Sequence, residues 1–171
     1  MAAAARGLPG LTAAMSTHAR HTEAIAVPRT IHVLNGPNLN RLGKREPEIY
    51  GRTTLAEVEA MCRAACGEDT LVFRQTNHEG QLVDWIHEAI DGDVAGIVIN
   101  PAGLTFGSIP LLDALKMFNG PIIELHISNI HRREAIYHRS LVSAVATAVI
   151  AGLGARGYPT ALRAMRELLD G

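Results

Sequence analysis

Runs of consecutive apolar residues alternate with helical stretches along this sequence, and the alternation strongly constrains its fold. The run 95–99 (Ala-Gly-Ile-Val-Ile) is apolar throughout, which is typical of a strand buried on both faces of a parallel sheet. Helical spacing elsewhere aligns Leu82, Ile86 and Ala89 on one stripe. Five strand–helix units therefore predict an α/β fold, with helices covering a five-stranded parallel sheet. The expected strands span residues 31–34, 71–74, 96–99, 122–125 and 145–150, and the expected helices span 54–66, 81–90, 109–118, a short stretch near 132–137, and 160–169.

Composition favours a single globular domain. With 171 residues, 47% hydrophobic content and a formal net charge of -1, the chain can bury a large core and lacks the basic excess of nucleic-acid-binding proteins. No apolar run reaches the roughly 18 residues that would cross a membrane. Cys62 and Cys66 stand four residues apart in an expected helix, so we expect reduced thiols in a cytoplasmic protein.

Residues 1–28 differ from the rest of the sequence. They are rich in alanine, carry one acid and show no sustained apolar periodicity. We expect a mobile tail, followed by a single domain over residues 29–171. A targeting segment is an alternative, and Met15 suggests that the chain could begin later.

Polar side chains follow each of the first four expected strands. These clusters occupy residues 35–38, 75–80, 100–105 and 126–129. Because parallel strands share one carboxyl edge, the loops should meet on one side of the sheet, where ligands bind in open α/β folds. The sequence therefore predicts a functional site at this edge, although each cluster taken alone is more typical of a turn than of a catalytic site.

The loop after the first strand carries groups suited to acid–base chemistry. It offers the amide of Asn38, the cations Lys44 and Arg45, and the phenol of Tyr50. A neighbouring guanidinium favours the phenolate form of a tyrosine, which is a base. A surface loop with solvated charges is the alternative interpretation of these residues.

Glu124 and His126 stand two apart on the fourth expected strand, so their side chains share one face. A carboxylate there can fix the tautomer of the imidazole and make it a general acid. A histidine paired with glutamate for structural reasons alone is the alternative. Ser128, with the backbone N–H groups of Ile127 and Ser128, offers donors for a substrate carboxylate, while Asn129 is suited to cap the next helix.

Other chemistries have weaker support in the sequence. The stretch 152–157 (Gly-Leu-Gly-Ala-Arg-Gly) only superficially matches a dinucleotide-binding motif, because it follows the last expected strand. No set of His, Cys and Asp has recognisable zinc spacing. A Schiff base would have to use Lys44 or Lys116, the only two lysines. Proton transfer without a cofactor or metal is the remaining hypothesis.

Four motifs then resemble one known family. The strings LNGPNLNRLGKREPEIYG, QTNHEGQLVDWIHEA, NPAGLTFGSIPLLDAL and IELHISNIHRRE resemble the type II 3-dehydroquinate dehydratases, in order and spacing, over about residues 30–170. The resemblance implies a flavodoxin-like three-layer sandwich with sheet order 2-1-3-4-5, assembled as a dodecamer of trimers. It also implies a cofactor-free anti elimination of water from 3-dehydroquinate, in the shikimate pathway or in quinate catabolism.

The resemblance also implies roles for individual residues. It makes Tyr50 the base, Arg45 its activating arginine, Asn38 the amide that holds an enolate-stabilising water, His126 the general acid, and Glu124 the carboxylate that orients it. It assigns substrate binding to Asn100, Ile127 and Ser128, a supporting position to Arg133, and to Asp113 a contact with a neighbouring subunit's site.

Two positions depart from the family's pattern. Phe106 stands where the family has a histidine, and Tyr137 stands where it has an arginine, four residues after Arg133. In the family these residues hold the two ring hydroxyls remote from the eliminated group. The sequence therefore leaves two alternatives open: the same elimination on a related β-hydroxy keto acid that lacks the diol, or a catalytically inactive paralogue that binds a carboxylate ligand or serves in assembly.

Overall fold

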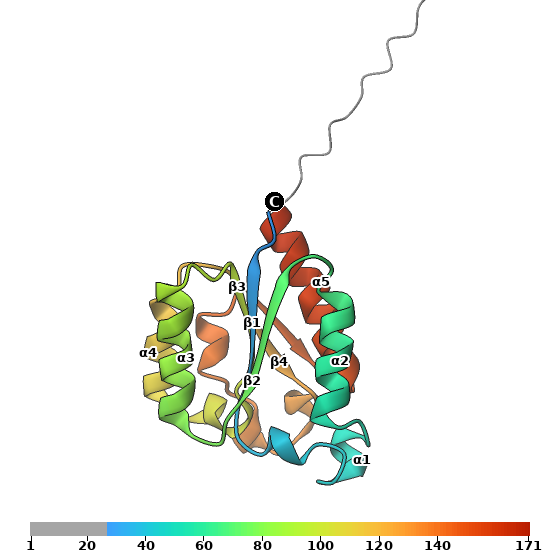
Figure 1. The fold of residues 1–171 in the computed structure, drawn as a ribbon. Helices are drawn as coiled ribbons and strands as arrows, with labels where there is room; N and C mark the ends of the chain where they lie inside the picture. The colour runs from blue at the N-terminus through green and yellow to red at the C-terminus, as the bar shows by residue number, and fades with distance from the viewer. Residues whose placement is uncertain (1–26) are drawn as a thin grey trace, which may run out of the picture.

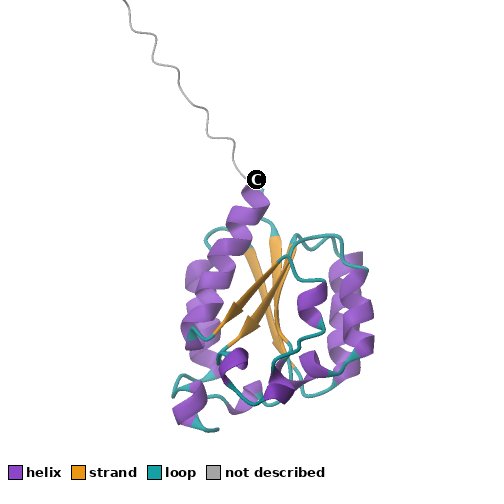
Figure 2. Cartoon of the chain, turned by 180° about the vertical axis from the view of Figure 1, so that it is seen from behind, coloured by secondary structure: helices purple, strands orange, loops and turns teal. Residues whose placement is uncertain are grey.

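A computed structural model describes residues 27–171, so the tail expected over residues 1–28 lies almost wholly outside the described residues. Five parallel strands form one sheet in the order β2-β1-β3-β4-β5. Helices α2 and α5 cover one face, and α3 and α4 cover the other (Figures 1 and 2). The predicted flavodoxin-like α/β sandwich and its strand order are confirmed. The strands are β1 (Thr30–Asn35), β2 (Thr70–Gln75), β3 (Gly96–Asn100), β4 (Ile122–His126) and β5 (Ala148–Ala151), and the helices are α1 (Pro47–Tyr50), α2 (Leu55–Ala65), α3 (Glu79–Asp91), α4 (Ile109–Lys116) and α5 (Gly157–Asp170).

Capping residues fix where two of the helices begin. The Thr54 hydroxyl accepts a bond from the Glu57 amide N–H, and the Glu57 carboxylate accepts one from the Thr54 amide N–H, which forms a capping box before α2. Ser108 accepts a bond from the Leu111 N–H at the start of α4. Each cap satisfies backbone donors that the first turn of a helix leaves unpaired.

Two expected elements differ from the structure. The short helix expected near 132–137 is instead a pair of 3-10 turns, Ile130–Arg132 and Ala135–Tyr137. The last strand begins at Ala148 and not at residue 145, because the backbone N–H groups of Val145 and Ala146 both donate to the Val142 carbonyl. Their hydrogen bonds are used locally, and cross-strand bonding starts when the Thr147 N–H donates to the Ile122 carbonyl.

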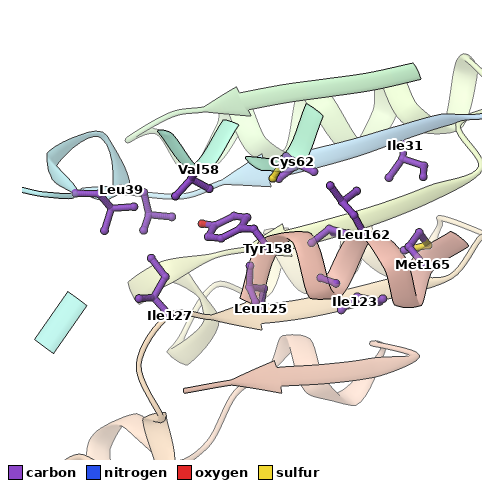
Figure 3. Close-up of a cluster of buried hydrophobic side chains, with 14 residues drawn as sticks. Ile31, Leu39, Val58, Cys62, Ile123, Leu125, Ile127, Tyr158, Leu162 and Met165 are labelled. Carbon is purple, nitrogen blue, oxygen red and sulfur yellow. The ribbon is translucent and has the colours of Figure 1, made fainter. Parts of the chain in front are cut away.

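The core lies in two parts, one on each face of the sheet. Alternation along β1 sends Ile31 and Val33 towards α2 and α5, and Leu34 towards α3 and α4. Figure 3 shows the first part, in which α5 packs against the sheet. The approach is so close that a Cβ at Gly96 would overlap the Met165 sulfur, so a side chain there would displace Met165.

Both cysteines are buried and unpaired. Burial raises the pKa of the Cys62 thiol to about 12, so this sulfur stays protonated and unreactive at neutral pH. Among residues 27–171 we find no helix with the length and apolar character that a bilayer crossing requires.

Candidate active site

A cavity of about 200 Å³ opens at the carboxyl edge of the sheet. The short helix α1 lies at the same edge (Figure 1). Loops that follow β1, β3 and β4 form its walls. All but two of the predicted site residues line it. The lining residues are Pro37, Asn38, Leu39, Leu42, Arg45, Tyr50, Asn100, Ala102, Gly103, Phe106, His126, Ile127, Ser128, Ile130, Arg133 and Tyr137.

The polar cluster after β2 does not line the cavity. It braces the loop that follows β1: the Asn77 side-chain oxygen accepts a bond from the Asn38 N–H at 2.9 Å, and Gln75 Nε2 donates to the Gly36 carbonyl at 3.2 Å. This loop therefore meets the loop after β1 at the same edge, as expected, but it supplies no side chain to the cavity lining. It is an outer neighbour because β2 is the edge strand, separated from β3 by β1.

Two non-glycine residues beside the cavity adopt left-handed backbone conformations. Asn38 has φ 68° and Ala102 has φ 51°. Asparagine tolerates this region and alanine is strained in it, so the surrounding loops must hold Ala102 in place. Gly36 makes the packing possible, because a Cβ there would overlap the Pro101 carbonyl oxygen.

The Glu124–His126 pair lies at the end of β4 and is buried. His126 Nε2 lies 2.7 Å from Glu124 Oε1, so the carboxylate fixes which ring nitrogen carries the proton. His126 lines the cavity, and Glu124 lies behind it.

Three hydroxyl groups hold the other lone pairs of Glu124. Thr105 Oγ1 donates to Oε1 at 2.8 Å, Ser140 Oγ donates to the same oxygen at 2.5 Å, and Ser143 Oγ donates to Oε2. Burial raises the pKa of Glu124, but the bonds from His126, Ser140 and Ser143 outweigh burial and hold the pKa below its usual value of 4.5. Glu124 is therefore an anion at neutral pH.

Tyr50 reaches the cavity from the single helical turn α1, which the sequence analysis expected to be loop. Glu46 precedes this turn with φ 38°, and Pro47 at its first position favours helical geometry. Two guanidinium groups lie near the phenol. Arg45 Cζ lies 5.5 Å from the centre of the Tyr50 ring, while Arg133 Nη1 donates to the Tyr50 hydroxyl at 3.2 Å.

Asn100 ends β3 inside a buried polar network. Its Nδ2 donates to the Tyr158 hydroxyl at 2.9 Å, and its Oδ1 accepts from the Ala102 N–H at 3.2 Å. The Tyr158 hydroxyl donates in turn to Asn35 Oδ1 at 2.7 Å. In Figure 3 this hydroxyl points towards the end of the sheet where Leu39 and Ile127 lie. Complete burial raises the pKa of Tyr158 well above its usual value of 10, so the phenol remains a neutral bridge.

Phe106 and Tyr137 contact each other on one wall. Their ring centres are 5.3 Å apart in an edge-to-face arrangement, and Phe106 lies stacked 6.4 Å from His126. The two departures from the family's pattern thus form one aromatic pair beside the predicted general acid.

The remaining predicted residues are divided between the cavity and the surface. Ile127 and Ser128 line the cavity, and Asn129 Oδ1 accepts from the His131 N–H, which is the expected cap. Asp113 is not among the residues that line this chain's own cavity. It is exposed on α4, where it accepts a bond from Lys116 Nζ at 3.0 Å. No group of three potential metal ligands occurs within the described part of the chain.

Sequence analysis missed Ser140, Ser143 and Tyr158. Neither Ser140 nor Ser143 directly follows an expected strand. Their three-residue spacing is typical of a hydroxyl that caps a turn, so the sequence indicates only a structural role for them. Tyr158 sits in an otherwise amphipathic helix, where a tyrosine indicates packing and no more.

Comparisons with known proteins agree on one family. The model of the family described as Dehydroquinase class II matches residues 29–166. The 3-dehydroquinate dehydratase of Acidovorax sp. (strain JS42) is 52% identical over 145 residues, which cover 81% of this chain and 98% of that protein. The 3-dehydroquinate dehydratase 2 of Agrobacterium fabrum is 58% identical over 141 residues, 81% of this chain and 95% of that protein. The crystal structure of the type II dehydroquinase from Butyrivibrio crossotus superposes with a TM-score of 0.79 at 38% identity, covering 81% of this chain and 98% of that one.

Proposed function

We propose that this chain, which belongs to the class II dehydroquinase family, is a hydro-lyase that converts 3-dehydroquinate to 3-dehydroshikimate and water in the shikimate pathway. The observation that carries the proposal is that a phenol in contact with a guanidinium and an imidazole paired with a carboxylate line one cavity. A base and an acid that face the same small space are what an elimination of water requires.

In the proposed mechanism, Tyr50 is the base. Its phenolate takes a proton from the carbon next to the ketone, and the electron pair moves into an enolate. Arg45 over the ring and Arg133 at the hydroxyl supply positive charge that stabilises the phenolate. Asn38, on the loop that follows β1, holds a water molecule that donates to the enolate oxygen.

His126 completes the elimination. It gives its proton to the β-hydroxyl, the C–O bond breaks, and the group departs as water while the enolate collapses to the enone. Glu124 orients the imidazole through the bond at His126 Nε2. No cofactor takes part, because the ketone of the substrate itself accepts the electron pair.

Substrate binding is assigned to the residues at the ends of β3 and β4. Asn100 faces the tertiary hydroxyl, while Ser128 and the backbone N–H groups of Ile127 and Ser128 donate to the carboxylate. Asn100 is well suited to this role because its amide is already oriented by Tyr158 and by the Ala102 N–H.

Residues 29–171 are proposed to form one domain that assembles as a dodecamer of trimers in the cytoplasm, with residues 1–28 dispensable. The exposed position of Asp113 on α4 leaves this side chain accessible to a neighbouring subunit's site, which is the role that the family resemblance implies for it. Quinate catabolism is the alternative role for the same reaction.

A direct assay tests the proposed reaction. The protein is mixed with 3-dehydroquinate, and the enone absorbance of 3-dehydroshikimate is followed with time. We expect turnover by the wild type and a loss of at least about 10²-fold in kcat for Tyr50→Phe, since positioned proton transfer contributes 10²- to 10⁴-fold. Turnover by Tyr50→Phe above about a tenth of the wild-type rate would assign the base elsewhere.

A second candidate function keeps the elimination but changes the substrate. The edge-to-face contact of Phe106 with Tyr137 favours it, because an aromatic pair leaves fewer charged donors for a ring diol. The substrate would then be a β-hydroxy keto acid with fewer ring hydroxyls. Phe106→His, compared with Phe106→Leu as a control for lost packing, distinguishes the two candidates. If Phe106→His lowers the KM for 3-dehydroquinate by about fivefold or more and Phe106→Leu does not, the second candidate is favoured.

A further inference from the structure

Arg133 is held between two tyrosines. Its Nη1 donates to the Tyr50 hydroxyl at 3.2 Å, and its Cζ lies 3.8 Å from the centre of the Tyr137 ring. The second distance is well within the range of a cation–π contact. The Tyr137 ring therefore covers the guanidinium whose donor reaches the proposed base.

Arg133 has no carboxylate partner within ion-pair distance among residues 27–171. Arg45, the other guanidinium near Tyr50, differs in this respect, since its Nε is bonded to the Glu46 carboxylate at 2.8 Å. The charge that is fully available to the Tyr50 oxygen is thus that of Arg133. An arginine without a carboxylate needs another contact to fix its side chain, and the ring of Tyr137 is such a contact.

Local bonds fix Tyr137 relative to Arg133. The Tyr137 N–H donates to the Glu134 carbonyl at 2.9 Å, and the His138 ring nitrogen lies 2.7 Å from the Arg133 carbonyl oxygen, so the segment closes on itself. The edge-to-face contact with Phe106, which also lines the cavity, packs against the Tyr137 ring as well. Phe106 and Tyr137 therefore act together on the position of Arg133.

We propose that Tyr137 is a positioning residue that uses its ring face to hold the Arg133 guanidinium on the Tyr50 hydroxyl. The catalytic consequence rests on the proposed function, whereas the contact itself does not. The aromatic pair then has a structural role besides substrate selection. It holds Arg133 in place of a carboxylate partner, and it leaves the positive charge of Arg133 available to the Tyr50 oxygen.

Kinetics of three variants test the positioning role. Tyr137→Phe keeps the ring face, and Tyr137→Leu and Tyr137→Met remove it. With 3-dehydroquinate we expect Tyr137→Phe to stay within about twofold of the wild-type kcat, and both aliphatic variants to lose about tenfold in kcat with KM changed less than about threefold. The role is overturned if the aliphatic variants keep full kcat, or if Tyr137→Phe loses as much as they do. If Tyr137→Leu does not fold, Tyr137→Met provides the test.

A stability cycle tests the contact without any assay of activity. Unfolding free energies are measured for Arg133→Met, Tyr137→Leu and the double variant, and we expect the double variant to lose clearly less than the two single losses combined. Arg74→Met is the matched control, because Arg74 Cζ lies 5.4 Å from the centre of the Trp85 ring. The loss of unfolding free energy from Arg74→Met should simply add to the loss from Tyr137→Leu. Additive losses in the Arg133 cycle overturn the contact. If the losses are not additive but the wild-type protein fails to convert 3-dehydroquinate, the contact is supported and the proposed function is refuted.

Discussion

Glu124 is fully buried, and its charge depends on four hydrogen-bond donors. Glutamine keeps the shape of this side chain but replaces an acceptor oxygen by a donor, so bonds from the surrounding hydroxyls are lost. It also removes the anion that stabilises protonated His126. The residue therefore contributes to folding and to catalysis through the same contacts.

Glu124→Gln should lower kcat on the order of 10²-fold and cost about 1–3 kcal/mol of unfolding free energy at pH 7. Because the folded-state pKa lies below 4.5, the stabilisation by the carboxylate is fully present above that pH and is lost as the pH falls through the folded pKa. Denaturant unfolding from pH 7 to pH 3 measures this. Glu59→Gln, which removes an exposed charge paired with Arg63, is the control. If the difference in unfolding free energy between the wild type and Glu124→Gln grows as the pH falls, the assignment is contradicted.

Single residues could be predicted from the sequence where one strand carries them. Glu124 and His126 were found because alternation along a strand places them on one face, and Tyr50 because it follows Arg45 in a loop at a strand end. Ser140 and Ser143 could not be found, because their contact with Glu124 depends on a segment that returns past β4 only in the folded chain.

At the scale of elements, the site depends on the close approach of two loops. The Gly36 N–H donates to the Asn100 carbonyl at 2.8 Å, which ties the loop after β1 to the end of β3. This contact brings Asn38 and Asn100 to the same cavity. A side chain at residue 36 would separate the loops.

Gly36→Ala should destabilise the protein and lower kcat/KM, because the added Cβ would overlap the Pro101 carbonyl oxygen and the backbone must move. We expect a loss of about 1–3 kcal/mol in unfolding free energy together with a fall of at least about tenfold in kcat/KM for 3-dehydroquinate. Gly80→Ala is the control, since no atom lies within 4 Å of a Cβ there and the residue is in α3. Equal effects of the two substitutions would rule out the steric explanation.

Periodicity predicted the sheet and its covering helices, and the family resemblance predicted the strand order, but neither predicted the 3-10 turns between β4 and β5. Strands and long helices bury regular faces, and such faces leave a repeating pattern. A 3-10 turn such as Ala135–Tyr137 is held by a few local hydrogen bonds, and many sequences can form it. Tyr137, which this turn presents to the site, was therefore found through the family resemblance and not through periodicity.

At the scale of the whole molecule, acid stability depends on a histidine outside the site. His32 lies in β1 and is buried, and its Nδ1 has no hydrogen-bond partner among residues 27–171. Burial, and then the positive charge of Arg74, hold the pKa of His32 below its usual value of 6.5. Above that pH the ring is neutral in the folded and unfolded states alike, and below it only the unfolded chain readily binds the proton.

The free energy of unfolding should therefore fall as the pH drops below 6.5, by up to about 1.4 kcal/mol per pH unit from this group. His32→Leu removes the group and should flatten the curve between pH 6.5 and the folded-state pKa of His32. Unfolding by denaturant at half-unit pH steps measures both slopes. Parallel curves for the two proteins would show that other groups control acid stability.

Subunit mixing tests the proposed assembly. Asp113 is 62% exposed and separate from its own cavity, so we expect Asp113→Asn and Tyr50→Phe each to be nearly inactive alone. After unfolding and refolding together in equal amounts, about a quarter of the sites in a symmetric assembly should combine an intact Tyr50 with a neighbour's intact Asp113. Recovered turnover supports shared sites, and light scattering gives the size. A mixture that stays as inactive as its components contradicts the role of Asp113.

The Tyr158 hydroxyl joins the ends of β1 and β3, yet Tyr158 belongs to α5, which follows every strand in the sequence. A ribosome delivers the strands before it delivers this helix, and domains acquire their packing as the chain emerges. A nascent chain that already carries all five strands would still lack the bridge between Asn35 and Asn100. The two asparagines at the strand ends would take up their final orientation only after the first turn of α5 has emerged from the ribosome.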